Sequence, residues 1–518
     1  MAIYYVDGDN GNDAWDGLYE TPQGGLSGPI ATVAQGMNMI AKSDELRIIK
    51  AAAAYDYGGI SLPALGAVQE SERFAMRGWV IGQAATDIVL PASRPVISAL
   101  TGSGADIIDL SDNDYISLVD LELNDAQSGF DGIDGNLASY LRVRRCLISN
   151  VDQGYNATNG PITDVIIEDN EISYCADAIK SSTGNIGITI RRNYIHHMLD
   201  GGTAGDGIQL QHEVDTPLLA DVLIEDNLLE DIEKQPITVS GCRTGTCIIR
   251  RNRIDCTGQT VDPSDAISIT SCLDFDIEEN LILDPNGNGI YASEGTLGVT
   301  LYLSGAGTIK NNLVLFSGAT ESFKRGIYIH SHDGAEGPLD IIGNTVYGTA
   351  EGVGGGGEGI MYRLDTGDAA GNPVCNIHNN ISAGNDDNGL EIRGTYAGGT
   401  VTVNNDYNCY FDNGAADISD GNGWGNSPET NGVTSDPQLI DPANWNVNLA
   451  PTSPCIGAGN PAETSQHGRA PDIGAREYGA PVTRQTGTAG RPARMRHGKY
   501  YRGSSAVDGL LEFVRMER

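Results

Sequence analysis

Several acidic residues share one sequence context that could support acid–base chemistry. Each stands two positions before an apolar residue of a short phrase, as Asp177 does in DAI and Asp206 in DGI. Glycosidases use two carboxylates roughly 5–9.5 Å apart, and a uronate lyase needs a base and a charge neutraliser, for which Lys180 and His212 are available. Asp177, Asp206, Lys180 and His212 are therefore our candidate catalytic residues. The other members of this acidic set are Asp131, Asp265 and Glu358.

The same acidic residues also fit a structural role, which the sequence favours. Each precedes Ala or Gly where the chain would turn, and an aspartate side chain there accepts hydrogen bonds from nearby backbone groups. The two interpretations differ in what the carboxylate oxygens contact. Catalysis needs carboxylate oxygens that a substrate can reach, whereas in a turn those oxygens already accept hydrogen bonds from the backbone.

A second candidate site combines aromatic, basic and polar side chains that would point outward from a sheet. Tyrosine rings offer stacking faces for sugars, and arginine offers a planar fork for a carboxylate or a sulfate. An ordinary solvated sheet is the alternative. The proposed carbohydrate-binding residues are Tyr291, Tyr328, His330, Arg363 and Arg393.

Neither the histidines nor the N-terminal aspartates form a recognisable metal motif. The histidines cluster twice, as His196 and His197 with His212 and as His330 with His332, but neither cluster has the spacing and the third ligand of a metal site. The opening segment carries four aspartates yet departs from the EF-hand order, because Gly11 stands in a ligand place. We predict that the protein uses no cofactor. The alternative is a calcium ion held by Asp7, Asp9, Asp13 and Asp16.

These side chains must be positioned by a repeat that dominates the chain. One phrase, apolar-x-apolar-x-x-Asn-x-apolar, recurs at intervals of 23 to 36 residues, with Leu121, Cys146 and Asp406 in the Asn place of degenerate copies. An irregular interval argues against a propeller or a helical repeat and fits coils with variable loops. The Asn residues are Asn170, Asn193, Asn227, Asn252, Asn280, Asn312, Asn344 and Asn380.

Each repeat contains a second apolar phrase with a period of two, which indicates a strand. Short strands separated by Gly, Asn and Asp turns predict an all-β, single-chain right-handed parallel β-helix. The Asn residues should lie where the chain bends and should hydrogen-bond along the stack. The predicted inward column is Ile179, Ile208, Ile237, Ile267, Ile290, Ile327, Ile360 and Leu390.

The ends of the chain break this pattern. Residues 1–45 include helical spacing at Ile30, Val33, Ala34, Met37 and Ile40, which predicts a helix that caps the first coil of a β-helix spanning 46–415. Residues 416–480, rich in Gly, Asn and Pro, predict an irregular C-terminal cap. Residues 481–518 predict a linker and a docking tail.

Composition limits the classes of partner. The 518 residues carry a net charge of −37, which argues against nucleic-acid binding by the body of the protein. No apolar run is long enough to span a membrane, and no signal peptide opens the chain. The tail is instead basic, with eight Lys and Arg against three Asp and Glu over 484–518. The nine cysteines include no CxxC pair and are predicted to be buried free thiols, Cys242 and Cys272 among them.

Two terminal segments carry a resemblance to a known family. YYVDGDNGNDAWDG near the start, SPCIGAG at 453–459 and RAPDIGAREYG at 469–479 resemble segments of secreted pectate-lyase-like β-helix proteins. With the Asn-bearing coils between them, the resemblance covers about 1–480. It implies the β-helix fold and a carbohydrate theme, and it fixes no catalytic residue.

Two functions remain open on this basis. The first is a virion surface protein of tailspike, head-fibre or capsid-decoration type, which binds surface polysaccharide, attaches to other virion proteins through its C-terminal tail and forms homo-oligomers. The second is a polysaccharide lyase or glycoside hydrolase acting on acidic polysaccharide. Both place the protein on a virion surface or outside the cell.

Overall fold

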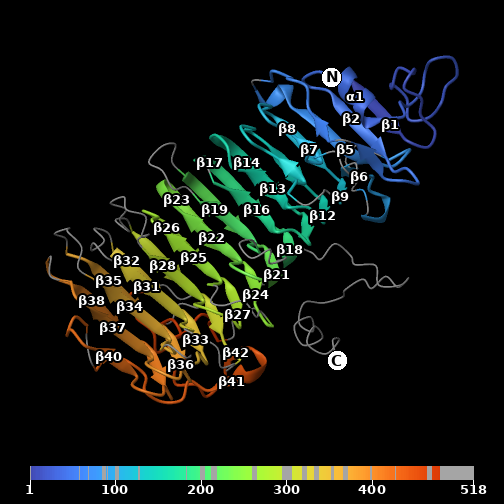
Figure 1. The fold of residues 1–518 in the computed structure, drawn as a ribbon. Coiled ribbons are helices and arrows are strands. Elements are labelled where there is room, and N and C mark those ends of the chain that lie inside the picture. Colours follow the sequence, from blue (N-terminus) through green and yellow to red (C-terminus); the bar gives the residue numbers. More distant parts are fainter. Residues whose placement is uncertain are drawn as a thin grey trace.

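A computed structural model shows an elongated coil of short strands that runs the length of the molecule (Figure 1). It describes residues 2–478 except 58, 68, 84–88, 90, 100–103, 126–128, 183, 199–204, 212–218, 259–264, 294–305, 318–323, 332–337, 352–354, 366–371, 397–398, 426–427 and 464–469. The basic tail, His212 and His332 lie outside these residues. Every strand of the coil pairs in parallel with the strands one turn before and after it.

Three parallel sheets form the sides of the coil, and we call them sheets 1, 2 and 3 in the order in which each turn visits them. Sheet 1 contains β1 (Ile3–Asp7), β2 (Glu45–Ile49), β5 (Phe74–Trp79), β8 (Ile116–Val119), β11 (Arg142–Arg144), β14 (Ile162–Glu168), β17 (Asn185–Arg191), β20 (Leu219–Glu225), β23 (Cys242–Arg250), β26 (Phe275–Glu278), β29 (Gly307–Lys310), β32 (Pro338–Ile342), β35 (Val374–His378) and β38 (Thr402–Asp406).

Sheet 2 contains β3 (Tyr55–Tyr57), β6 (Val96–Ala99), β9 (Glu122–Asn124), β12 (Leu147–Ser149), β15 (Glu171–Ser173), β18 (Tyr194–Met198), β21 (Leu228–Ile232), β24 (Arg253–Asp255), β27 (Leu281–Leu283), β30 (Leu313–Leu315), β33 (Thr345–Tyr347), β36 (Ile381–Ala383) and β39 (Cys409–Phe411). Sheet 3 contains β4 (Ile60–Ser61), β7 (Ile108–Asp109), β10 (Ile133–Asp134), β13 (Gln153–Ala157), β16 (Asp177–Ser181), β19 (Ile208–Gln211), β22 (Ile237–Ser240), β25 (Ile267–Thr270), β28 (Ile290–Ser293), β31 (Ile327–Ser331), β34 (Ile360–Leu364), β37 (Leu390–Gly394) and β40 (Ile418–Asp420).

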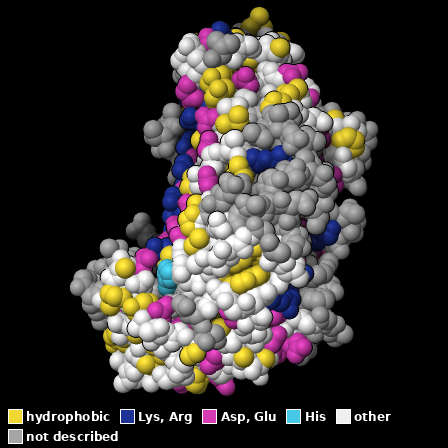
Figure 2. Space-filling model, turned by 90° about the vertical axis from the view of Figure 1, so that its left-hand side faces the viewer, with side chains coloured by type: hydrophobic (Ala, Val, Ile, Leu, Met, Phe, Trp, Pro, Cys, Tyr) yellow, Lys and Arg dark blue, Asp and Glu magenta, His cyan; other side chains and the backbone are white. Residues whose placement is uncertain are grey.

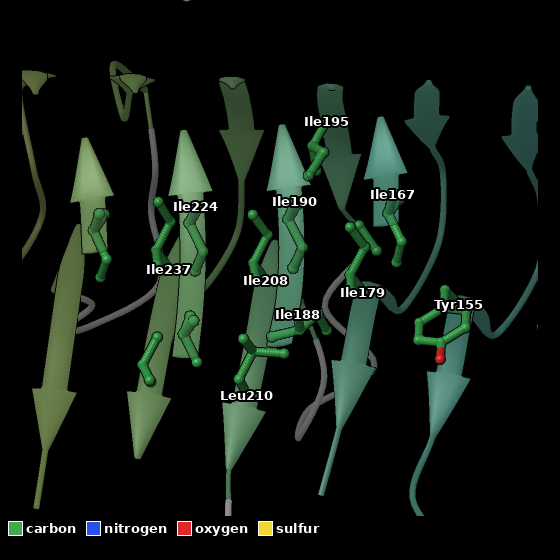
Figure 3. Packing of buried hydrophobic residues seen from close by; sticks show 14 of the residues in the cluster. Tyr155, Ile167, Ile179, Ile188, Ile190, Ile195, Ile208, Leu210, Ile224 and Ile237 are labelled. Carbon is green, nitrogen blue, oxygen red and sulfur yellow. The ribbon is translucent and has the colours of Figure 1, made fainter. Parts of the chain in front are cut away.

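The predicted inward column is confirmed residue by residue. Ile179 pairs with Ile208, Ile208 with Ile237, and the register continues to Leu390. All eight side chains are fully buried in one continuous apolar cluster. Figure 3 shows Ile179, Ile208 and Ile237 side by side on successive strands, facing the isoleucines of sheet 1. This column therefore adds one apolar residue per turn to a core that all three sheets line.

The asparagines form a buried ladder at the bend between sheets 1 and 2. Each side-chain Nδ2 donates to the Oδ1 of the next coil's asparagine at 2.9–3.1 Å, from Asn170 as far as Asn408. The residue in the left-handed conformation is the one before each asparagine, such as Asp169 at φ 59° and Arg192 at φ 54°, so our placement of the bend on asparagine itself is wrong by one residue.

The last rung of this ladder also corrects the predicted register. His378 pairs with Asp406, so Asn380, two residues after His378, aligns with Asn408. Asn408, and not Asp406, therefore occupies the Asn place. The repeat was misaligned because Asn405 fills the inward position that an apolar residue holds in other coils, and its side chain is fully buried.

Removing one rung should destabilise the whole coil. Asn252→Ala would take side-chain bonds from four buried groups: the Ile224 carbonyl, the Asn280 Oδ1, and the N–H and Nδ2 groups of Asn227. We expect the free energy of unfolding to fall by about 3 kcal/mol or more, measured by urea denaturation. Asn404→Ala removes an exposed Asn–Asn bond and should cost less than about 0.5 kcal/mol. Equal losses in the two variants would contradict a stabilising ladder.

Beside the ladder runs a line of charged side chains that the sequence analysis overlooked. Successive coils contribute pairs of like charge in alternation, so each acidic pair adjoins a basic one (Figure 2). Arg192, for example, contacts Glu168 at 2.6 Å and Asp169 at 2.8 Å. If a coil paired with the next coil but one, pairs of like charge would lie side by side and repel. The line of charges therefore favours the observed pairing of coils. Its members are Arg144, Arg145, Glu168, Asp169, Arg191, Arg192, Glu225, Asp226, Arg250, Arg251, Glu278 and Glu279.

The N-terminal helix α1 (Val33–Met39) forms close to its predicted place. It begins later than expected, because Thr32 caps it by accepting a bond from the Gln35 N–H at 3.1 Å. Ile30 instead bridges to Val6, and Ala34 is exposed. Val33 and Met37 belong to the main core cluster, while the sealing of the first coil stays a prediction.

The other helical elements of the described residues are short 3₁₀ turns. They are η1 (Glu70–Glu72), η2 (Pro91–Ser93) and η3 (Pro442–Asn444). Within the same residues, no helix is long and apolar enough to cross a membrane.

The segment after the last coil packs along the outer face of sheet 2. Its hairpin, β41 (Leu439–Asp441) and β42 (Asn446–Leu449), lies over β27 to β36 in Figure 1. Val447 contacts a cluster of outward leucines from β27 and β30, and Cys455 and Ile473 join a second cluster with β36 and β39. Sheet 2 is therefore covered on both faces in this half of the coil.

All nine cysteines are buried and free, as predicted. Cys247 contacts both Cys242 and Cys272 inside the coil. The Leu273 N–H donates to the Cys242 carbonyl at 2.9 Å, which places Cys242 and Cys272 on adjacent coils.

Candidate active site on sheet 3

The structure places Asp177 and Lys180 on β16 and Asp206 two residues before β19. Oδ1 of Asp177 accepts from the N–H groups of Gly205 and Asp206 at 3.2 and 3.1 Å, and Oδ2 contacts Lys180 Nζ at 2.9 Å. Asp177 is only 2% exposed. Both carboxylate oxygens are thus engaged by the protein itself.

The neighbouring carboxylates repeat this arrangement. Asp206 accepts from the Gln235 N–H at 3.1 Å and from Gln209 Nε2 at 2.7 Å. Asp131 likewise accepts from the N–H of Gln153 on the following coil. Each carboxylate ties its own coil to the next, which fits the turn role of this column.

Burial shifts the acid–base equilibria of this column. It raises the pKa of Asp131 to about 7 and those of Asp206 and Asp265 to about 6, against backbone and amide hydrogen bonds that act in the opposite direction. Unfolded aspartate titrates near pH 4. Between about pH 4 and pH 7 the folded protein therefore binds more protons than the unfolded chain.

Stability should consequently fall as the pH rises through this window. Because the folded-state pKa values are raised, their favourable contribution is complete below about pH 4 and is lost by about pH 7. We expect the melting temperature to be higher at pH 5 than at pH 8, by calorimetry at constant ionic strength. Asp131→Asn should reduce this pH dependence. A melting temperature that rises toward pH 8 would contradict the assignment.

The proposed carbohydrate-binding residues come together farther along sheet 3. The register pairs Tyr291 with Tyr328, and His330 with Arg363 and then Arg393, across the adjacent strands β28, β31, β34 and β37. The Tyr291 and Tyr328 rings lie 5.2 Å apart, and Tyr328 stacks on His330 at 5.7 Å. At ordinary strand spacing the strip is about 14 Å long.

Asp365, which the sequence analysis missed, links two residues of this strip. Its Oδ2 lies 3.1 Å from His330 Nε2 and 2.7 Å from an Arg363 guanidinium nitrogen. Burial raises the pKa of Asp365, but the bonds and charges of Arg363 and His330 outweigh it and lower the pKa overall. A negative charge beside His330 fixes the orientation of the ring.

A pair of glutamates lies beside this strip. Glu358 occupies the acidic column, but its Oε2 lies 2.8 Å from Arg325 Nε, and its carboxyl group lies close enough to that of Glu391 on the next coil to affect the pKa of Glu391. Burial, together with the Glu358 contact, raises the pKa of Glu391 to about 7. Glu391 therefore keeps its proton near neutral pH with a second carboxyl group beside it.

Arginines surround the glutamates. Arg325 also stacks over the Tyr328 ring, with its Cζ 4.8 Å from the ring centre. Arg393 contacts Glu391 Oε1 at 3.1 Å. The Arg363 and Arg393 side chains are 36% and 43% exposed, whereas those of Glu358 and Glu391 are 3% and 12% exposed. Charged forks therefore lie at the surface, with the acid pair below them.

The strip departs from the predicted open sheet in one respect. Tyr328 is 9% exposed and Met361, the next residue in its outward column, is fully buried. Tyr291 is half-buried. The outer face of sheet 3 is thus partly covered here, so only part of the ring surface is open to a sugar.

The other predicted ligand groups are engaged by the protein. Asp7 accepts from the N–H groups of Asp9 and Asn10, Asp13 from Thr32, and Asp16 from Leu18. Within the described ranges, no group of three or more His, Cys, Asp or Glu side chains is arranged to hold a metal ion.

Comparison with known proteins supports the fold seen here. The family model for the right-handed β-helix region matches residues 97–243, 132–305 and 183–363, which together span more than half of the chain. This chain belongs to that family. The resemblance to pectate-lyase-like β-helix proteins is confirmed at the level of fold. No curated protein matches the chain.

Among solved structures, the β-helix chain is similar to three carbohydrate-related proteins. Pectate lyase Pel9A shares 13% identity, with 92% of this chain and 96% of that chain covered and a TM-score of 0.40. XylC with xylose shares 10% identity, with 84% and 87% covered and a TM-score of 0.37. The alginate lyase from Paenibacillus sp. str. FPU-7 shares 14% identity, with 65% and 95% covered and a TM-score of 0.33.

Proposed function

We propose that this β-helix protein is a carbohydrate-active enzyme that hydrolyses glycosidic bonds in an acidic polysaccharide on the outer face of sheet 3. The observation that carries the proposal is the Glu358–Glu391 pair. Two carboxyl groups from adjacent coils lie near one another there, and burial together with the Glu358 carboxyl group raises the pKa of Glu391 to about 7. Glycoside hydrolysis uses one carboxylic acid to protonate the leaving oxygen and a second carboxylate, roughly 5–9.5 Å away, as base or nucleophile. In this proposal the two glutamate side chains move apart to that separation as the sugar enters between them.

The surroundings assign the two roles. Glu391 still carries its proton near neutral pH and serves as the general acid. Glu358 pairs with the permanent charge of Arg325 at 2.8 Å and supplies the second carboxylate. Loss of the Glu391 proton above about pH 7 would end the acid step.

The strip beside the pair supplies recognition. Arg363 and Arg393 are the most exposed of these groups, and a guanidinium binds a uronate carboxylate or a sulfate through two parallel hydrogen bonds. Tyr291 and Tyr328 add apolar contact for the sugar ring. The net charge of −37 repels an acidic polymer at long range. At the strip itself, the local group of arginines attracts it.

A lyase reaction at the same strip is the second candidate, and one observation favours it. His330 is held by Asp365 at 3.1 Å and stacks on Tyr328, so an oriented base lies beside the arginines. β-Elimination needs such a base and a neutraliser for the uronate carboxylate.

Product analysis separates these reactions. The protein is incubated with polygalacturonate, alginate and a sulfated galactan, and new reducing ends and the ultraviolet absorbance of unsaturated uronates are both followed. Hydrolysis gives reducing ends without absorbance, and elimination gives both. No product from any acidic polymer would contradict an enzymatic role.

The virion role predicted from the sequence receives no support from the described part of the chain. Its anchor, residues 484–518, lies outside those residues. A location outside the cell, which would suit a polysaccharide substrate, stays a prediction.

A further inference from the structure

A second cluster of aromatic rings lies at the corner between sheets 2 and 3, on coils nearer the N-terminus than the acid pair. Tyr174 follows β15, and His196 and His197 belong to β18 one coil later. The Tyr174 and His197 rings stack at 4.9 Å, and Tyr194 stacks on His196 at 4.0 Å. The proposed reaction does not use these rings, and they lie outside the main core cluster.

The two outer rings of this cluster are exposed. Tyr174 is 41% exposed, and the His197 side chain is 39% exposed, whereas His196 is buried beneath them. Tyr174 and His197 each adopt the left-handed conformation, at φ 56°. Most other coils place Asp, Asn or Gly in that conformation at this corner: Asp125, Asn150, Asp231, Asp284, Gly348, Gly384 and Asp412. A tyrosine in this conformation costs free energy that an asparagine there avoids.

Carboxylates surround the rings. Glu171 lies 3.3 Å from His196 Nε2, Asp231 lies 3.5 Å from His197 Nε2, and Glu230 accepts the Tyr194 hydroxyl at 3.0 Å. A ring face attracts the C–H groups of a sugar, and carboxylates accept hydrogen bonds from its hydroxyls. The same carboxylates repel uronates and sulfates.

We propose that Tyr174 and His197 form a second glycan-binding site, specific for a neutral polysaccharide and separate from the cleavage site on sheet 3. The site holds one sugar ring against the exposed Tyr174 face, with Glu171, Glu230 and Asp231 near its hydroxyls. Its chemistry is opposite to that of the arginine strip, which selects acidic sugars. One protein would thereby bind a neutral polysaccharide at the corner site and hydrolyse an acidic polysaccharide on sheet 3.

Affinity electrophoresis of the full chain tests this site. Native gels contain mixed-linkage β-glucan, galactomannan or polygalacturonate, and the wild-type protein should be retarded by at least one neutral polymer. Tyr174→Asn removes the ring and installs the residue found at Asn150, so folding should be kept. We expect the apparent Kd for the neutral polymer to rise about tenfold, the loss of one stacking contact, with the melting temperature unchanged or raised.

Two control variants give the test its specificity. Tyr140→Asn changes another tyrosine at φ 56°, one whose ring is half-buried and stacks on Tyr115 at 4.4 Å, and it should leave neutral-polymer binding intact. Glu391→Gln alters only the sheet 3 site, so it should also bind as the wild type even if no cleavage activity exists. The proposal is wrong if no neutral polymer retards the wild-type protein, or if Tyr174→Asn and Tyr140→Asn bind alike.

Discussion

Ile237→Asp should reduce the free energy of unfolding by about 4–5 kcal/mol or prevent folding altogether. Ile237 is fully buried in the middle of the inward column, between Ile208 and Ile267 on the coils before and after. An aspartate there would bury a carboxyl group among apolar side chains, without the backbone donors that satisfy the corner aspartates. The effect should appear as a large shift of the urea denaturation midpoint, or as insoluble protein.

Ser240→Asp is the matched control for this substitution. It lies three residues later on the same strand, β22, and its side chain points outward and is half-buried. We expect a change within about 1 kcal/mol, since water can reach the new carboxylate. Similar losses of unfolding free energy in both variants would contradict the register, which places Ile237 on the inner face of sheet 3 and Ser240 on the outer face.

Glu391→Gln should lower kcat on the acidic substrate by about 10²–10⁴-fold, because the glutamine cannot deliver a proton to the leaving oxygen. Substrate binding should change little, since the amide keeps the shape of the side chain. In the wild-type protein kcat/KM should fall above about pH 7, as the Glu391 proton is lost. Initial rates of reducing-end release across pH measure both effects.

Asp206→Asn serves as the comparison for catalysis. Its carboxylate is bonded to Gln209 and to the Gln235 N–H, and an asparagine oxygen can keep the backbone bond. Turnover should remain within about twofold of the wild type, a change far smaller than the loss of turnover expected for Glu391→Gln. If Asp206→Asn abolishes turnover and Glu391→Gln does not, the reaction belongs to the acidic column and our assignment fails.

Much of the fold was predictable because it depends on local periodicity. The inward isoleucines and the asparagines recur in fixed phrases, so their columns follow from the sequence once the repeat is aligned. The alignment failed at Asn408, because Asn405 replaces the apolar residue that marks the register in that coil. The alternation of charge beside the ladder was equally visible in the repeats RR, ED and EE, but it needed the coils to be compared in adjacent pairs.

The packing of the C-terminal segment on sheet 2 also left a signal in the sequence. Several strands of that sheet, such as β9 (ELN), β15 (EIS) and β24 (RID), place one apolar residue between two polar ones, but β27 and β30 read LIL and LVL and are buried throughout. Three apolar residues in a row predict a strand covered on both faces. What covers it could not be predicted, since the covering segment lacks the repeat.

The candidate site was predictable in part. The outward columns placed the tyrosines and arginines on one strip, because register alone decides their neighbours. Asp365 lies just beyond the end of its strand, outside any column, so no periodicity identified it. The Glu358–Glu391 contact joins two different columns, and it depends on how two long side chains turn toward one another.

The measurement that tests the central claim most directly is a structure of the Glu391→Gln protein with an acidic oligosaccharide bound. We predict that the sugar lies along β28, β31, β34 and β37, with its carboxylates at Arg363 and Arg393. A glycosidic oxygen should lie within hydrogen-bond reach of the substituted amide, at the place where the wild-type carboxyl group of Glu391 stands. An oligosaccharide lying instead beside Asp177 and Asp206 would contradict the account.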